Sequence, residues 1–212
     1  MNPKIAIMRL AQTMNDDLCK AVVYYEVFAP TGLHAPLLDR VNHHQIHEGF
    51  NVVSEALELG VITILCRIWD KTRGTARITE IASRLLKNRG LVSDHGQLAQ
   101  WQADVDNIQK SEALVALRAF RNVALAHSND PNLPDPRSKS NARRVLCGDT
   151  CIVLEGTISI MERLNSLIGL TYPSDFNQMR PRWEQRAGKF WAALTPNDLT
   201  QFHTNPPQER AQ

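Results

Sequence analysis

The sequence has little of what marks several classes of protein. Its 212 residues include only 10 glycines, 11 prolines and 4 cysteines, and 6% of them are aromatic. The longest apolar run, Leu59 to Cys66, is eight residues long, against the roughly 20 that a membrane span requires. No Cys-x-x-Cys pair occurs, and a domain of this size needs no disulfides. These absences predict a cytoplasmic protein with reduced thiols and no membrane span.

Charge is also nearly balanced, with a formal net charge of +2. That total does not by itself predict a polyanionic partner. The charges are uneven, however, and residues 71–90 carry six cations against Glu80: Lys71, Arg73, Arg77, Arg84, Lys87 and Arg89. This segment is either a solvated helix face or a wall that faces phosphates.

The prolines gather in four clusters, and the long stretches between them predict helices. No segment alternates apolar and polar residues as a strand does. The expected helices are residues 3–28, 37–69, 78–87, a helix from 97, then 111–128, 141–168 and 175–194. The first carries an apolar stripe from Ile7 to Tyr25 at spacings of three and four residues, and Trp69 and Trp191 are expected in the core. We therefore predict an all-α fold, an antiparallel helical bundle, with one domain over residues 1–195 and a polar tail over 196–212.

The most informative segment ends the helix that Ser111 is expected to cap. It reads Phe120-Arg121-Asn122-Val123-Ala124-Leu125-Ala126-His127-Ser128. Arg121 and His127 are six residues apart, which in a helix places them roughly 120° apart and about 9 Å along the axis. A long arginine side chain could still meet His127 on one bound phosphate, while Asn122 could orient the phosphate or the imidazole.

These residue types suit RNA cleavage without a metal. Histidine titrates near neutral pH and can move the proton of a ribose 2′-hydroxyl, and a permanently charged arginine can stabilise the charge that develops on phosphorus. The spacing alone is not specific, because Arg40 with His47 and Arg89 with His95 also satisfy it. The alternative is that His127 caps a helix and Arg121 forms a surface ion pair.

The segment Arg121-Asn122 with His127 resembles the signature of HEPN (higher eukaryotes and prokaryotes nucleotide-binding) domains, and is most similar to their U-type abortive-infection branch. Arg67-Ile68-Trp69-Asp70 resembles an upstream segment of that branch, so the resemblance covers roughly residues 5–170. It implies a helical bundle, here with additional C-terminal helices, that dimerises, cleaves RNA without a metal and serves in phage defence or as a toxin. Some HEPN proteins only bind or scaffold. Asn129 replaces a tyrosine that is modified in another branch, so that regulation is not implied.

A histidine cluster offers a different hypothesis. His43 and His47 would lie one turn apart on a helix, near His34 and His44, and could grip a transition metal in a metal-dependent hydrolase. The order His-Glu-x-x-His is absent, and a polar helix start is the ordinary explanation. We therefore predict no metal and no cofactor.

The sequence thus predicts an endoribonuclease in which Arg121, Asn122 and His127 form the catalytic site. Further RNA contacts are expected from six residues: Arg118, Ser128, Arg137, Lys139, Arg143 and Arg144. The expected partners are RNA, a second copy of the chain in a homodimer, and an antitoxin or other regulatory protein. The alternative is a non-catalytic helical module that binds a nucleotide, RNA or a protein in a defence system.

Overall fold

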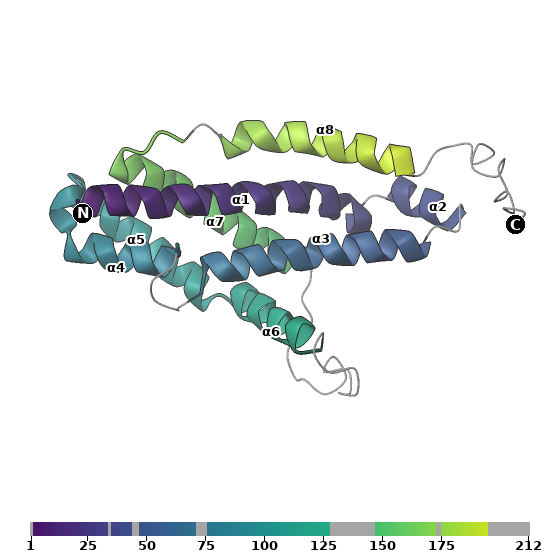
Figure 1. Cartoon of the computed structure of the whole chain (residues 1–212), viewed down its shortest axis with the longest axis horizontal. Helices are drawn as coiled ribbons and strands as arrows, with labels where there is room; N and C mark the ends of the chain where they lie inside the picture. Colours follow the sequence, from purple (N-terminus) through teal and green to yellow (C-terminus); the bar gives the residue numbers. More distant parts are fainter. Residues whose placement is uncertain are drawn as a thin grey trace, which may run out of the picture.

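A computed structural model describes residues 2–33, 35–43, 47–70, 76–127, 147–172 and 175–194 (Figure 1). Within these ranges the chain forms α-helices, one short 3-10 helix and no strand, which confirms the all-α prediction. The elements are α1 (Pro3–Leu33), α2 (Ala35–His43), α3 (His47–Ile68), α4 (Ile78–Lys87), η1 (Arg89–Leu91), α5 (His95–Lys110), α6 (Glu112–His127), α7 (Cys147–Ile168) and α8 (Phe176–Leu194).

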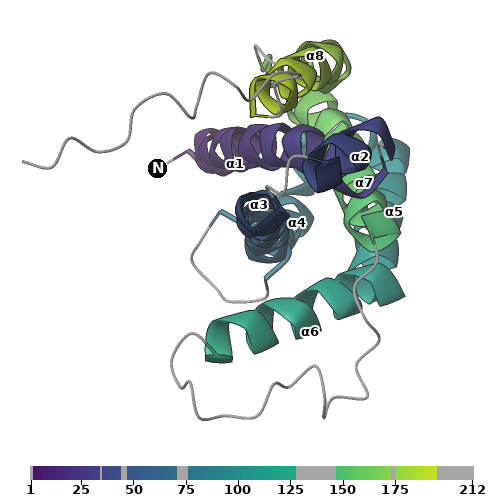
Figure 2. The same ribbon diagram turned by 90° about the vertical axis from the view of Figure 1, so that its right-hand side faces the viewer.

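The bundle is built around α1, the longest helix, which packs against α3, α7 and α8 (Figures 1 and 2). Helix α3 runs antiparallel to α1, whereas α8 runs in the same direction as α1 because α7 has already returned along the bundle. Helix α6 lies at the edge of the bundle beyond α3, and its C-terminal end points away from the other helices. In both views α8 and α6 occupy opposite edges.

The core follows the predicted apolar stripe of α1. Its positions are all buried except Leu10, which is partly buried: Ile7, Met14, Leu18, Ala21 and Tyr25. Trp69 and Trp101 are 0% exposed, and each indole N–H has an acceptor, Thr157 Oγ1 at 2.8 Å and the Ile160 carbonyl at 2.9 Å. A buried tryptophan needs such a partner for its N–H group. Trp191 is also buried, so the predicted core positions of Trp69 and Trp191 are confirmed.

Two predicted helix boundaries are wrong. Helix α1 does not stop at residue 28 but continues through Pro30 to Leu33. Proline removes a backbone donor, and its ring crowds the carbonyl four residues earlier, so it usually ends a helix. In α1 one more turn follows Pro30, in which the Thr31 hydroxyl donates to the Phe28 carbonyl at 2.7 Å. The single helix expected over 37–69 is two helices, α2 and α3. The tract between Val41 and Phe50 is polar apart from Ile46, so little apolar surface favours one continuous helix there.

Boundaries with clear local signals lie at or within two residues of their predicted positions. Helix α4 has the predicted bounds, and the backbone N–H of Leu114 donates to Ser111 Oγ at 3.2 Å, which confirms the predicted cap. Helix α5 begins two residues before the predicted position because Asp94 caps it, accepting from the Gln97 N–H at 2.9 Å. Residues 141–146 of the predicted helix 141–168 and the predicted tail 196–212 lie outside the described residues.

Helix α3 has one further property. Among the described helices it alone is long and apolar enough to cross a membrane, with a mean hydropathy of 1.5 over its most apolar 18 residues. In this structure its C-terminal half packs against α1, α6 and α7 through residues such as Val61, Ile62 and Leu65. The cytoplasmic location therefore stays a prediction.

Candidate functional site at the end of α6

Helix α6 has two different halves. In residues 112–117, which we call the packed half, Ala113, Leu114, Ala116 and Leu117 are buried. From Arg118 onward, in residues 118–127, the described side chains are only partly buried or exposed. We call these residues the projecting half. The apolar seam of the packed half, continued by the partly buried Phe120, therefore fixes α6 in the bundle, and beyond it Arg121 and Asn122 are presented at its edge.

Arg118, at the boundary between the two halves, connects α6 to the end of α3. One of its terminal nitrogens, Nη2, donates to the backbone carbonyl of Trp69, just after α3. The Trp69 indole in turn donates to Thr157 Oγ1 on α7, and the Thr157 hydroxyl donates to the Val153 carbonyl at 2.6 Å. These hydrogen bonds connect α6, α3 and α7 in series, so they fix the position at which the projecting half begins. The predicted contact of Arg118 with RNA stays a prediction.

Arg121 lies one turn beyond Arg118. Its side chain is partly exposed, and both Nε and Nη2 donate to the side-chain oxygen of Asn122, at 3.3 and 3.0 Å. From the sequence we expected Asn122 to orient a phosphate or the imidazole. In the structure its oxygen holds the guanidinium of Arg121, so the two adjacent residues act as one preoriented cationic group.

Three guanidinium groups gather where α6 meets the end of α3. Arg77 and Arg118 lie near the Asp70 carboxylate, and Arg121 lies near Arg118. The formal charges of these four groups sum to +2. The Asp70 carboxylate lies 3.5 Å from Arg77 Nη1. Arg67 Nη2 lies 2.7 Å from Asp17 Oδ1. Such a cationic junction favours a bound anion such as a phosphate.

Cys66 is the thiol beside this junction. It is fully buried, and burial raises its pKa from 9.0 to about 11, although the nearby Arg121 and Arg118 oppose the rise. The thiol therefore stays protonated at neutral pH, and a protonated thiol is a poor nucleophile. Cys66 is therefore not a candidate nucleophile.

The structure brings together only part of the predicted site. Arg118, Arg121 and Asn122 lie within two turns of one helix. His127 is the last residue of α6, as a site at a helix end requires, but its side chain lies outside the described residues. Five other predicted RNA contacts also lie outside them: Ser128, Arg137, Lys139, Arg143 and Arg144.

The structure gives little support to the other two candidate sites, the histidine cluster and the basic segment 71–90. His43 is the last residue of α2 and His47 the first of α3, so they do not share one helix face as the sequence predicted. The described residues contain no group of three or more His, Cys, Asp or Glu side chains that could hold a metal ion. In the basic segment 71–90, Arg77 pairs with Asp70, and Arg84 Nε lies 2.7 Å from Glu80. Part of that charge is therefore used inside the fold.

No protein-family model, curated protein or solved structure matches this chain. The chemistry of the projecting half of α6 must therefore be inferred from its own residues. Sequence reasoning missed the contribution of Thr157 and of the Trp69 carbonyl, because nothing local to either residue indicates that a distant helix needs them.

Proposed function

We propose that the protein is a metal-independent endoribonuclease, acting in phage defence or as a toxin, whose site is the projecting half of α6. The observation that carries this proposal is the guanidinium of Arg121, partly exposed and held by two hydrogen bonds to Asn122, two turns before the helix-terminal His127. A fixed arginine can bind a phosphodiester through two N–H groups. A histidine at the C-terminal end of a helix is stabilised as the imidazolium.

The reaction needs only these groups and the RNA. The ribose 2′-oxygen attacks the adjacent phosphorus, its proton passes to a base, and the bond from phosphorus to the 5′-oxygen breaks as that oxygen takes up a proton. Histidine is the side chain that titrates near neutral pH, so His127 is the residue that we assign to these proton transfers, and Arg121 stabilises the extra negative charge on the phosphorus oxygens. The products are a 2′,3′-cyclic phosphate and a 5′-hydroxyl.

A second copy of the chain would complete the site. Two α6 ends that face one another across a dimer would bring two Arg121 groups and two His127 residues to one cleft. This arrangement avoids the geometric problem within one helix, where Arg121 and His127 are roughly 120° apart around the axis.

The test is cleavage of an end-labelled RNA pool by purified protein in the presence of a chelator. Wild-type protein should cut the RNA, and the Arg121→Ala/His127→Ala double variant should not. The matched control is Arg89→Ala/His95→Ala, which removes the same residue types at the same spacing from an exposed part of the chain. Equal cutting by wild type and the α6 double variant would overturn the assignment. Absence of cutting by all three proteins would favour the non-catalytic binding module.

A further inference from the structure

A shallow groove of about 440 Å³ runs between α1 and α8. Its α1 wall includes Lys20, Val23 and Tyr24, and the other wall includes Tyr172, Met179 and Trp183. The two helices run in the same direction here, and α8 lies on the edge of the molecule opposite to α6 (Figures 1 and 2). Helix α8 also lies beyond residues 5–170, so the resemblance to HEPN domains says nothing about this groove.

The aromatic rings of the groove are held in place by neighbours and stay partly exposed. Tyr24 is 39% exposed, and its ring rests on Gly60 of α3, where an added Cβ would lie 2.7 Å from Tyr24 Cδ2. Trp183 is partly exposed, and the guanidinium carbon of Arg186 lies 4.7 Å from its ring centroid. Phe190, two turns further along the same flank of α8, is 41% exposed. Rings that are fixed by their neighbours and open to solvent are suited to stacking with another flat group.

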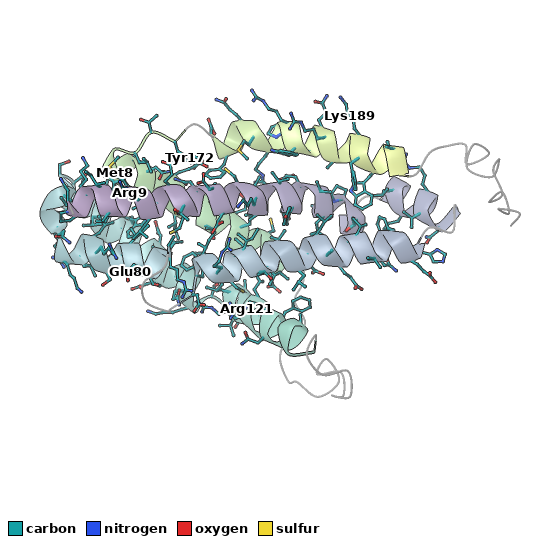
Figure 3. All side chains as sticks on the ribbon, viewed as in Figure 1. Met8, Arg9, Glu80, Arg121, Tyr172 and Lys189 are labelled. Carbon is teal, nitrogen blue, oxygen red and sulfur yellow. The ribbon has the colours of Figure 1, made fainter. Side chains whose placement is uncertain are left out.

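Cations accompany these rings. On α8, Arg182, Arg186 and Lys189 are exposed against one exposed acid, Glu184, and none of the three cations forms a salt bridge with another described residue. Figure 3 shows the Lys189 side chain standing out from α8, on the side of the molecule away from Arg121. Arg180 differs from these cations because it bonds to Glu26 and Glu155 within the bundle.

Asp16 is the acid that lines the groove, and its Oδ1 accepts a hydrogen bond from the Tyr172 hydroxyl at 2.8 Å. The neighbouring Asp17, outside the lining, lies 2.7 Å from Arg67 and 3.9 Å from Lys20 Nζ. The Lys20 side chain is 64% exposed. The surface therefore combines open aromatic faces with exposed cations, which is the pattern of single-strand binders.

We propose that the groove between α1 and α8 binds single-stranded RNA, with bases stacked on Tyr24 and Trp183 and phosphates near Lys20 and Arg186. The choice of RNA rests on the proposed function. Because this groove and Arg121 lie at opposite edges of the molecule, the groove holds a part of the strand that is distant from the cleaved bond (Figure 3). It would therefore increase affinity for long RNA without taking part in the reaction.

The binding test uses the full chain with Arg121→Ala to prevent cleavage, and a fluorescein-labelled 12-nucleotide oligouridylate whose anisotropy is measured with a chelator present. Trp183→Ala and Tyr24→Ala should each weaken binding by about 5- to 100-fold, since stacking on one aromatic side chain has an effect of that size. Trp183→Phe and Tyr24→Phe should bind within about threefold of the parent, because they keep a ring. Ile152→Ala, which removes an exposed apolar side chain on α7, is the control and should change nothing.

The cleavage test separates the groove from the site on α6. With Arg121 restored, Trp183→Ala should raise KM for a 30-nucleotide RNA and leave the cleavage of a four-nucleotide RNA unchanged. If no protein cuts RNA but the anisotropy results hold, the nuclease proposal fails and the groove stands. Unchanged RNA binding by Trp183→Ala and Tyr24→Ala would overturn the groove proposal. The groove proposal would also be overturned if polyglutamate bound as tightly as the oligouridylate and if Trp183→Ala and Tyr24→Ala weakened both equally. That result would indicate an acidic protein partner.

Discussion

The two halves of α6 differ in what they contribute. The packed half contributes Ala113, Leu114, Ala116 and Leu117 to the core, and the projecting half carries the Arg121–Asn122 pair at the edge of the bundle. Arg118 stands at the boundary and is tied to the Trp69 carbonyl. Position along one helix therefore separates stability from chemistry. Substitutions of the buried residues of the packed half should destabilise the protein, and substitutions of Arg121 and Asn122 should leave it folded.

The largest expected effect is that of Arg121→Ala on activity. Loss of one positioned group that stabilises transition-state charge lowers the cleavage rate by about 10²- to 10³-fold. The free energy of unfolding should change by less than about 0.5 kcal/mol, because the side chain is partly exposed and outside the core. Cleavage rates and urea unfolding curves measure the two quantities. A large loss of stability would show that the projecting half also supports the fold.

The packed half should behave in the opposite way. Leu117→Ala removes a fully buried side chain and should destabilise the protein by about 2–5 kcal/mol, measured by urea unfolding. Val115→Ala on the same helix, where the side chain is 57% exposed, should cost less than about 0.5 kcal/mol. Equal effects of the two substitutions would contradict the packing of this half.

Alkaline pH tests the junction between the two helices α3 and α6. Because the pKa of Cys66 is raised from 9.0 to about 11, its contribution to stability is complete below pH 9. As pH rises from 9 to 11 the unfolded chain ionises first, and that contribution falls by up to about 2–3 kcal/mol. Unfolding curves at pH 8 to 11 should therefore decline less steeply for Cys66→Ala than for wild type. Parallel declines would show that Cys66 is not buried as described.

A smaller effect is expected where α7 supports Trp69. Thr157→Val keeps the side-chain shape but removes the acceptor of the buried Trp69 indole N–H. An unsatisfied buried donor costs about 1–3 kcal/mol, which thermal or urea unfolding will detect. Thr13→Val, at an exposed position of α1, is the control with the same chemical change. An unchanged stability for Thr157→Val would remove this hydrogen bond from the account of how α3, α6 and α7 are joined.

The sequence predicted what local signals determine. The bounds of α4 and the cap at Ser111 follow from residues within one turn, and the core positions of Trp69 and Trp191 follow from the apolar pattern. The passage of α1 through Pro30 was not predictable in this way, because a proline ordinarily marks the end of a helix. The separation of α2 from α3 was missed although the tract between Val41 and Phe50 is polar apart from Ile46.

The candidate site was predicted in part. The sequence identified Arg121 and Asn122 by their position near a helix end. It did not predict the hydrogen bonds between them, because the Asn122 amide could equally have contacted a phosphate or the imidazole. The contact of Arg118 with Trp69 spans 49 residues and depends on how α6 packs on α3. The groove between α1 and α8 likewise needs Tyr24 and Trp183, which are far apart in the chain, to lie side by side.

We propose above all that the projecting half of α6 cleaves RNA by directing attack of the RNA's own 2′-hydroxyl on the adjacent phosphorus. The most direct measurement is mass spectrometry of the products from one RNA and from the same sequence with 2′-O-methyl groups, both incubated with wild-type protein and a chelator. The account predicts 2′,3′-cyclic phosphate and 5′-hydroxyl ends from the RNA and no cutting of the methylated strand. Cutting of the methylated strand, or products with 5′-phosphate and 3′-hydroxyl ends, would contradict it.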